Sequence, residues 1–275
     1  MKRERKNVLV SILVNNFNNE KYLNKCIDSC IKQTYKNIEI IIFDDKSTDS
    51  SKNILEKYKN NKIKIIFNKK KKFNSGPLNQ LNSIYISLKQ SKGKYIFLLD
   101  GDDYFLKNKI SQSIKTFNLN PKIVFLQDNP IYKYDNKNIL PKKIKPKRKI
   151  FVNHTWPFFS PTSTMSFERD FLVKLLAKIA FSKSLFDQMF FDARAFIYIY
   201  FFEKNYIVSD KYLTIYNQNL KGDTLKNYQK KNKNWWVRRL QYHCYVDSIF
   251  KRNKKTHFKF IDYYITLLIN LILKI

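Results

Sequence analysis

Three carboxylates stand close together in Asp100-Gly101-Asp102-Asp103, directly after the apolar run Tyr95–Leu99. Carboxylates this close repel one another, and a bound divalent cation removes that repulsion. Carboxylate oxygens suit Mg²⁺ or Mn²⁺, and these ions bind phosphate oxygens at their remaining positions. An acidic turn that caps the next helix would use the same residue types. The cluster alone therefore predicts either a metal–phosphate site or a structural turn.

Elements that would position this cluster follow from the hydrophobic pattern of the first hundred residues. We expect strands at Val8–Val14, Ile38–Phe43, Ile63–Phe67 and Tyr95–Leu99, with helices between them. Such alternation is typical of β-α-β units and a mainly parallel sheet, in which ligands bind outside the carboxyl ends of the strands. Three of the four strands end in polar clusters, so the sequence predicts a site at that edge.

Composition is that of an ordered globular protein, with 44% apolar residues and only 4 Gly and 7 Pro. The 53 Lys and Arg against 22 Asp and Glu give a formal net charge of +31. Such a charge suggests nucleic acid or an anionic membrane as a partner. No single basic block or nucleic-acid motif stands out, however, so we expect no nucleic-acid partner.

Cysteine usage indicates a reducing compartment, because the chain has three cysteines. Cys26 and Cys30 have the spacing of a buried helix face, and a metal site would need further ligands at suitable spacing. The basic residues 1–7 precede a short apolar run without a small-residue cleavage site. We therefore expect no signal peptide and a cytoplasmic location.

Two longer stretches resemble the family 2 glycosyltransferases. Residues 10–51 resemble the family's opening, with its strand, polar turn, helix, Q-T-Y, second strand and D-D-x-S-x-D. Residues 74–103 resemble its second block, which runs from a Gly loop through Asn and a helix to G-x-Y-I and D-x-D-D. Order and spacing hold over roughly a hundred residues, which makes the joint match specific.

The resemblance implies an α/β fold of the GT-A type, a Rossmann-like, mainly parallel sheet flanked by helices, here with an α-helical C-terminal extension. We expect a transferase domain over residues 1–220, with a nucleotide-binding half (1–103) and an acceptor half (104–220), and a basic helical extension over 221–275. The resemblance also implies inverting transfer from a nucleotide sugar, in the first place a UDP-sugar, with Mn²⁺ or Mg²⁺. The acceptor would be a bacterial surface glycan such as lipooligosaccharide or capsule.

Matching motif positions carry the family's roles to individual residues of this sequence. The residues expected to contact the nucleotide sugar are Asn16, Phe17, Asp45, Gly76, Asn82 and Asp100. The residues expected at the metal are Asp102 and Asp103. Asp45 is expected to accept a hydrogen bond from uracil, because an ionised carboxylate is a pure acceptor for an imide N–H.

Two positions depart from the family's pattern. Leu81 stands where relatives often have a basic residue, so one of the lysines at 69–72 is an alternative source of that charge. Asn217 and Asn219 stand in a motif that carries charge in many relatives and contacts phosphate or metal. We therefore expect closure over the diphosphate to differ in this chain.

A transferase of this kind also needs a general base for the acceptor hydroxyl. Family members carry an acidic residue at the start of an apolar helix, and the segment SKSLFDQMFFDARAF offers Asp187 and Asp192. We expect Asp187 to be the base, since it stands at the expected helix start, where a carboxylate is favoured; a simple helix cap is the alternative. Asp192, about a turn later, is expected to point elsewhere and to contact Arg194.

The acceptor half contains Trp156, which is expected either to stack on an acceptor sugar or to lie in the core. The tail Phe258–Ile275 is apolar but too short to span a bilayer. Its interruptions Asp262, Thr266 and Asn270 line one helix face. We expect either an interfacial helix on the anionic inner leaflet, where lipid-linked acceptors lie, or a helix packed on the protein or on a second subunit.

Two other function classes compete with the transferase. A basic protein that binds nucleic acid or lipid headgroups without catalysis is favoured by the charge, but the acidic sheet edge argues against a nucleic-acid cleft there. A nucleotidyltransferase would also use a metal and carboxylates. The pairing of D-D-x-S-x-D with D-x-D-D disfavours it.

Overall fold

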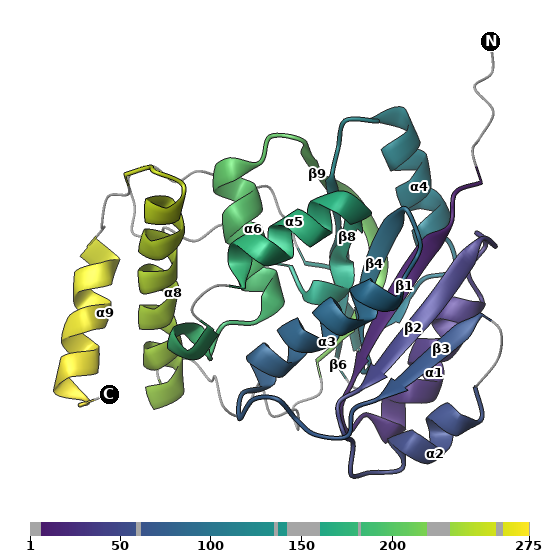
Figure 1. The fold of residues 1–275 in the computed structure, drawn as a ribbon, viewed down its shortest axis with the longest axis horizontal. Coiled ribbons are helices and arrows are strands. Elements are labelled where there is room, and N and C mark those ends of the chain that lie inside the picture. Colours follow the sequence, from purple (N-terminus) through teal and green to yellow (C-terminus); the bar gives the residue numbers. More distant parts are fainter. Residues whose placement is uncertain are drawn as a thin grey trace.

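The structure is a computed structural model that describes residues 7–58, 62–134, 137–141, 160–180, 183–218, 232–256 and 261–274. A single mixed sheet forms its centre (Figure 1). The strands are β1 (Val10–Asn16), β2 (Ile38–Asp44), β3 (Ile63–Phe67), β4 (Tyr95–Asp100), β5 (Tyr104–Phe105), β6 (Phe125–Tyr134), β7 (Lys137–Ile139), β8 (Met165–Glu168) and β9 (Tyr206–Asn217). They run in the order β3-β2-β1-β4-β8-β6-β9-β5, and β7 pairs with β6.

The first half of the sheet is parallel, as the alternating pattern predicted. β1 lies between β2 and β4, and β3 pairs with β2. The second half is mixed, because β8 runs antiparallel to both β4 and β6, while β9 runs parallel to β6 and antiparallel to β5. The predicted α/β class is confirmed, and the parallel half carries the polar strand ends together to one edge.

Helices cover both faces of the sheet (Figure 1). The described α-helices are α1 (Glu20–Ile31), α2 (Ser51–Glu56), α3 (Gly76–Gln90), α4 (Lys109–Leu119), α5 (Arg169–Ile179), α6 (Phe191–Phe202), α8 (Lys233–Arg252) and α9 (Ile261–Ile272). One apolar cluster joins the sheet to α1, α2 and α4, and a second joins its other face to α3, α5, α6 and α8. Cys26 and Cys30 are buried in the first cluster, as predicted.

Local signals explain where α3 begins. The Ser75 side chain accepts a hydrogen bond from the Leu78 N–H at 3.3 Å, and Pro77 follows in the first turn. A serine cap with proline just inside the helix satisfies and pre-sets the first turn. The cap fixes the start of α3 beside the carboxyl ends of β1 and β4. Residues of the following turns of α3 then face these strand ends.

The helix α6 begins at Phe191, later than the start at Asp187 that the sequence predicted. The residues before it wrap around the guanidinium of Arg194, which is fully buried. Arg194 donates to the carbonyls of Ile179 (3.2 Å), Phe186 and Met189 (3.1 Å). The guanidinium of Arg194 is therefore bonded to backbone carbonyls that precede α6 in the chain. These bonds replace the contact that was expected between Arg194 and Asp192.

The helix α8 belongs to the second apolar cluster through Tyr245, Val246 and Ile249, all fully buried. Two separate structural units on either side of residue 220 remain a prediction. None of the helices in the described ranges is both long and apolar enough to cross a membrane.

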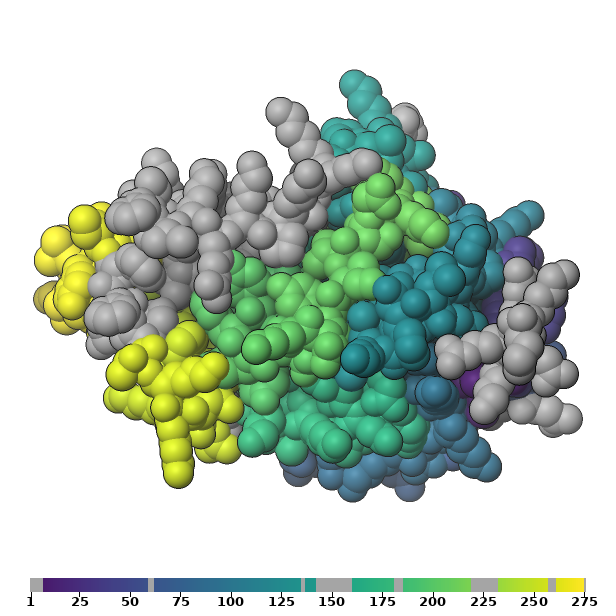
Figure 2. Space-filling view, turned by 90° about the horizontal axis from the view of Figure 1, so that it is seen from above, coloured from purple at the N-terminus to yellow at the C-terminus, as the bar shows by residue number. Residues whose placement is uncertain are grey.

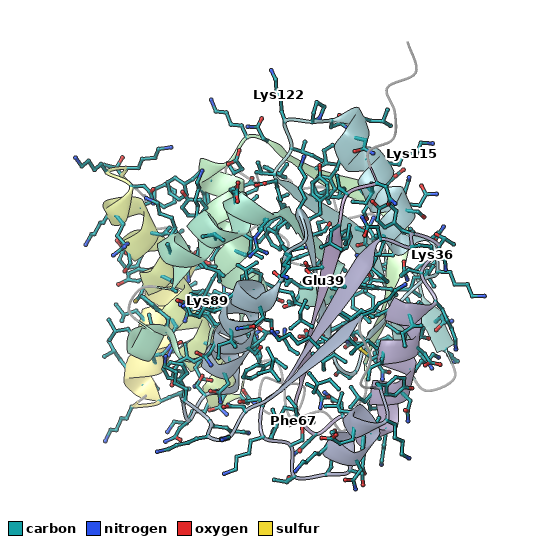
Figure 3. All side chains as sticks on the ribbon, turned by 45° about the vertical axis from the view of Figure 1, so that its right-hand side comes forward. Lys36, Glu39, Phe67, Lys89, Lys115 and Lys122 are labelled. Atoms are coloured by element: carbon teal, nitrogen blue, oxygen red, sulfur yellow. The ribbon has the colours of Figure 1, made fainter. Side chains whose placement is uncertain are left out.

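Exposed lysines are spread over the molecule. Lys36, Lys89, Lys115 and Lys122 project outward from different elements (Figure 3). These four positive charges lie on different elements of the described structure.

Candidate functional site

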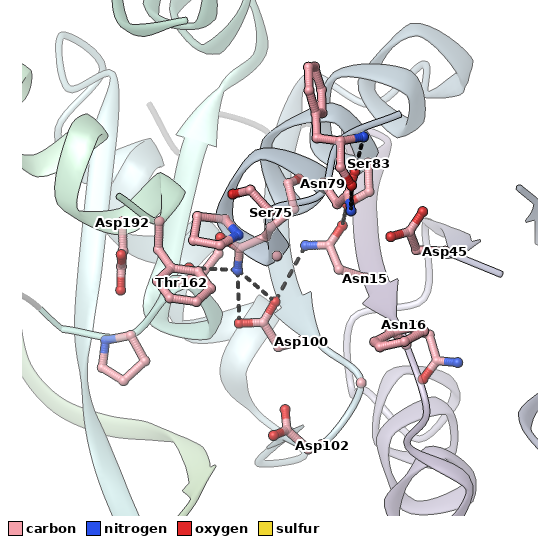
Figure 4. Close-up of a pocket in the computed structure, with 18 of the residues that line it drawn as sticks. Asn15, Asn16, Asp45, Ser75, Asn79, Ser83, Asp100, Asp102, Thr162 and Asp192 are labelled. Atoms are coloured by element: carbon pink, nitrogen blue, oxygen red, sulfur yellow. Dashed lines mark hydrogen bonds between the residues drawn. The ribbon is translucent and has the colours of Figure 1, made fainter. Parts of the chain in front are cut away.

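A pocket of about 860 Å³ lies at the carboxyl ends of β1, β2 and β4 (Figure 4). Asp45 and Asp192 stand at opposite sides of this pocket, with Asp100 and Asp102 between them. Segments far apart in the sequence supply its walls: the ends of three parallel strands, the start of α3, the start of α6, and α8. Its position is the one predicted for a ligand in a parallel sheet.

The two carboxylates that end β2 differ in their surroundings. Asp44 is buried and accepts hydrogen bonds from the Asn16 side-chain amide at 2.7 Å and the Ser47 N–H at 2.9 Å. Asp45 lines the pocket and accepts one from the Asn68 side chain at 2.7 Å. Burial raises the pKa of Asp45. Asp44 therefore holds the turn, and Asp45 lines the pocket.

Phe17 stands on the rim of the pocket with 39% of its surface exposed. The ammonium nitrogen of Lys71 lies 3.1 Å from the centre of the Phe17 ring, and its charge also opposes the rise in the pKa of Asp45. Lys71 is thus the lysine of the 69–72 run that lines the pocket. It supplies a cation to the pocket, whereas Leu81 is buried in the apolar core.

A chain of side-chain hydrogen bonds positions Asp100. Gln80 donates to Asp100 Oδ1 at 3.2 Å, and Asn15 donates to the same oxygen at 3.4 Å. Ser83 in turn donates to Asn15 Oδ1 at 2.5 Å. Burial raises the pKa of Asp100, and these donors oppose that rise. Two residues of α3 therefore set the position of the last carboxylate of β4.

The remaining acids of the cluster face different surroundings. Asp102 lines the pocket, where burial, followed by the charge of Asp100, raises its pKa to about 7. Asp103 is fully buried and accepts hydrogen bonds from Ser163 Oγ at 2.5 Å and the Asn217 N–H at 2.8 Å. Asp102 is thus the carboxylate of the pair that faces the cavity, while both oxygens of Asp103 bind the protein.

The described ranges contain no group of three Asp, Glu, His or Cys side chains arranged to hold a metal ion. A protein cage for the ion is therefore absent from these ranges. Mg²⁺ and related ions, however, commonly bind through one or two carboxylates together with substrate phosphates. Burial and, after it, the charge of Asp100 raise the pKa of Asp102, and a bound cation would favour its ionised form. The residues present fit an ion that binds together with a diphosphate.

A buried polar network lies behind the carboxylates. Lys109, fully buried, forms an ion pair with Asp128 and donates to Thr214 Oγ1 at 2.9 Å. Thr214 also donates to Asp128 at 2.8 Å, and the Lys109 ammonium lies 3.5 Å from the carbonyl oxygen of Ser163. Because Ser163 bonds to Asp103, this network connects the turn after β4 to β6 and β9.

The two candidate bases lie in different places. Asp192, in the first turn of α6, lines the pocket, and burial raises its pKa to about 6. Asp187 is outside the pocket lining and accepts a hydrogen bond from Gln241 of α8 at 2.7 Å. The backbone carbonyl of Asp187 also accepts from Ser75 at 2.5 Å. The geometry therefore favours Asp192 for the role that the sequence assigned to Asp187.

The pocket residues that α8 contributes were not identified by the sequence analysis. Arg238 and Tyr242 reach the pocket from one face of α8, one turn apart. Tyr216 of β9 also lines it. The spacing of Arg238 and Tyr242 was visible in the sequence, but the basic, aromatic segment around them matched no motif.

Among the predicted contacts, Asn16, Phe17, Asp45, Gly76, Asp100 and Asp102 all line the pocket. Asn82 is buried within α3 outside the pocket lining, where Asn79, Gln80 and Ser83 stand instead. Trp156 and Asn219 lie outside the described residues. The roles of all these residues remain predictions.

Comparison with known proteins gives the family. The model of the Glycosyl transferase family 2 matches residues 11–176, which is more than half of the chain. The chain is 40% identical over 121 residues to the UDP-Glc:alpha-D-GlcNAc-diphosphoundecaprenol beta-1,3-glucosyltransferase WfaP of Escherichia coli, covering 44% of this chain and 45% of that protein. It is 32% identical over 145 residues to the enzyme of the same description, WfgD, also of Escherichia coli, covering 53% and 54%. The chain thus matches about half the length of these curated relatives.

Solved structures give the fold. TarS of S. aureus in complex with UDP-GlcNAc superposes with a TM-score of 0.59 at 19% identity, covering 86% of this chain and 66% of that chain. The mannosyltransferase PcManGT from Pyrobaculum calidifontis, in complex with GDP-Man and Mn²⁺, superposes with a TM-score of 0.55 at 12% identity, covering 91% and 65%. These likenesses confirm the predicted GT-A-type fold.

Proposed function

Since the chain belongs to glycosyl transferase family 2, we propose that it transfers a glycosyl group from a nucleotide sugar to a lipid-linked glycan. The observation that carries this proposal is the single pocket that Asp45, Asp102 and Asp192 all line (Figure 4). A base-binding carboxylate, a phosphate-side carboxylate and a pocket acid of raised pKa are what a nucleotide-sugar transferase requires. The product would be a bacterial surface glycan.

A UDP-sugar is the donor that we propose. Asp45 accepts the uracil imide N–H, and the exposed ring of Phe17 packs against the base. The printed names of WfaP and WfgD specify UDP-Glc, and one TarS structure holds UDP-GlcNAc, which supports this choice of nucleotide. Asn16 and Gly76 contact the same donor from the first turn and from the start of α3.

The diphosphate is held at the carboxylate turn and by nearby cations. Asp102 binds Mn²⁺ or Mg²⁺, which when bound neutralises the charge that develops on the leaving diphosphate. Lys71 and Arg238 both line the pocket as cations of the protein itself. They supply the positive charge that the family's usual positions lack in this chain.

Asp192 acts as the general base. Its carboxylate removes the proton from the acceptor hydroxyl as that oxygen bonds to the anomeric carbon, while the bond from this carbon to the diphosphate oxygen breaks. The proton ends on Asp192 and the electron pair leaves with the nucleoside diphosphate. Attack and departure on opposite faces of the sugar invert the anomeric configuration, which NMR of the product measures directly.

The acceptor that we propose is a sugar–diphosphate–polyprenol at the inner face of the cytoplasmic membrane. The names of the two E. coli relatives specify such a lipid, which supports the class. We also propose the division of the chain into a transferase domain to residue 220 and a helical extension after it, with α8 of the extension supplying Arg238 and Tyr242 to the pocket.

The test uses the full chain with Mn²⁺, a GlcNAc–diphospholipid acceptor, and UDP-glucose, UDP-GlcNAc or GDP-mannose in turn. We expect a mass-resolved glycolipid product with a UDP-sugar and far less of it from an Asp192→Asn variant in the same time. Failure of every UDP-sugar to bind would overturn the proposed donor. Normal UDP-sugar binding with no product on any diphospholipid would instead overturn the acceptor class.

A further inference from the structure

The helix α9 packs on the protein through its polar side. Asp262, Thr266 and Asn270, one turn apart, are only 5%, 0% and 2% exposed. Arg239 of α8 donates to Thr266 Oγ1 at 3.0 Å and to Asp262 Oδ2 at 3.2 Å. Asn270 donates to the carbonyl oxygen of Trp236 at 3.2 Å. The polar side of α9 therefore faces α8 and is held to it by these hydrogen bonds.

The other side of α9 is apolar and exposed. Its residues Ile261, Ile265, Leu268, Leu271, Ile272 and Leu273 are between 45% and 69% exposed. A surface helix of a water-soluble protein normally turns such a stripe toward the core. Here the polarity is inverted, and α9 lies at one end of the molecule with α8 on its inner side (Figures 1 and 2). A contiguous apolar patch of this kind marks an interaction surface.

Basic residues border the apolar side of α9 at both ends. The two helices run antiparallel, because Asn270 meets Trp236 while Asp262 meets Arg239 farther along α8. The exposed cations Lys251, Arg252 and Lys254 at the end of α8 therefore lie toward the start of α9, and Lys274 follows its end. The ammonium nitrogen of Lys255 lies 5.0 Å from the centre of the Phe202 ring of α6. A helix with an apolar side and flanking cations suits the headgroup region of an anionic bilayer.

An apolar surface could also bind a second copy of the chain. Charge distinguishes this partner from a bilayer. Each molecule has a formal net charge of +31, and a dimer through α9 would bring the basic residues that border α9 in one copy close to those of the other copy. Juxtaposed like charges oppose association, whereas anionic headgroups complement these basic residues. The charge balance therefore favours lipid.

The helix α8 connects this surface to the pocket. Arg238 and Tyr242 line the pocket, while Arg239 and Trp236 on the adjacent side hold α9. Neighbouring helix axes lie about 10 Å apart, so two helices place the outer side of α9 on the order of 20 Å from the pocket. A sugar–diphosphate carried on a lipid in the bilayer would meet the pocket across that distance.

We propose that the exposed apolar side of α9, with its cationic border, docks the protein on an anionic phospholipid bilayer. The inference deepens the proposed function, on which it rests for the lipid-linked acceptor. Leucine and isoleucine side chains enter the acyl boundary, and the lysines pair with phosphate headgroups. Docking requires no bound donor or acceptor.

The test is co-sedimentation of the full chain with vesicles of phosphatidylcholine alone or mixed with phosphatidylglycerol. The variant is Leu268→Glu with Leu271→Glu, since both side chains are exposed and leave the α8 contacts intact. Leu119→Glu at the end of α4 is the matched control, because Leu119 is 72% exposed and lies elsewhere on the surface. Thermal unfolding of each variant checks that the fold is retained.

We expect the wild type to bind the anionic vesicles, the double variant to lose about a hundredfold in partition coefficient, and the control to be unchanged, since each leucine withdrawn from lipid costs about tenfold. Equal binding of wild type and double variant, or wild-type binding that ignores phosphatidylglycerol, would overturn the proposal. A dimer in sedimentation velocity that the double variant abolishes would assign the face to a second copy. We also expect the double variant to transfer sugar to a water-soluble acceptor as the wild type does. This measurement distinguishes a loss of membrane docking from a failure of the proposed function.

Discussion

The side-chain amide of Gln80 donates to Asp100 Oδ1 at 3.2 Å. The carbonyl oxygen of the same amide accepts the backbone N–H of Phe191, also at 3.2 Å. One residue of α3 therefore joins the last residue of β4 to the first residue of α6. Because Asp192 follows Phe191, Gln80 sets the separation between the donor-side carboxylate and the proposed base.

Replacing Asp192 by Asn should lower kcat by about 10²–10⁴-fold while UDP affinity stays close to that of the wild type, because a general base acts in the transition state. Asp187→Asn is the matched control and should keep most of the activity, since Asp187 bonds to Gln241 outside the pocket lining. Steady-state kinetics and calorimetry with UDP measure both effects. The opposite pattern would return the role of base to Asp187.

Activity should depend on pH through the same carboxyl group. Burial raises the pKa of Asp192 to about 6, and the base must be ionised to accept a proton. kcat/KM should therefore rise with pH up to about 6 and level off above it. The residual activity of Asp192→Asn should lack this rise; if it retains the same inflection, another group is responsible.

Metal binding should depend on Asp102 and on pH. The pKa of Asp102 is raised from 3.8 to about 7, so between these two pH values the folded apo protein holds a proton that the unfolded chain has released. The contribution of Asp102 to the stability of the apo protein is therefore lost as pH rises through about 7. Mn²⁺ with UDP should compensate, and should raise Tm more at about pH 8 than at about pH 5. Thermal shift of Asp102→Asn should show neither the gain nor its pH dependence. An unchanged gain would remove Asp102 from the metal site.

Phe17→Ala should weaken UDP binding by about 1–3 kcal/mol, the range measured for stacking of a base on an aromatic side chain. Tyr85→Ala provides the control, because Tyr85 is 47% exposed on α3 and does not line the pocket. Calorimetry of both variants with UDP gives the comparison. Similar affinities for the two variants would place the base elsewhere.

Two glycines should differ sharply in their tolerance of alanine. A Cβ at Gly93 would lie 2.4 Å from the backbone nitrogen of Ser11 in β1, whereas one at Gly76 meets nothing within 4 Å. Gly93→Ala should destabilise the fold by about 1–3 kcal/mol or more, as overpacking of a core does. Gly76→Ala should leave the free energy of unfolding almost unchanged. Denaturant titration of both variants measures the difference.

Residues that directly follow strands were accessible from sequence. Phe17, Asp45 and Asp102 each stand within a few positions of a strand's carboxyl end, and parallel pairing brings these ends together whatever the rest of the chain does. Asn82 lies outside the pocket lining for a local reason: Asn79 and Ser83, one turn apart, mark the side of α3 that faces the pocket, and Asn82 lies off that side.

Features fixed by long-range contacts were not accessible from sequence. The start of α6 depends on the carbonyls that Arg194 collects from Ile179, Phe186 and Met189, which no periodicity reveals. The tail pattern predicted an amphipathic helix correctly. Which side turns inward was decided by Arg239, a residue of another helix.

The ion pair of Lys109 and Asp128, with Thr214 and Ser163 around it, has a consequence for ligand affinity. Its members come from α4, β6, β9 and the segment before β8, so the turn that carries Asp103 is braced from four directions. A turn braced in this way has already lost its conformational freedom during folding. A loose loop would lose conformational entropy when it binds a metal–diphosphate, and this loss would weaken the affinity for the donor. The braced turn avoids that loss.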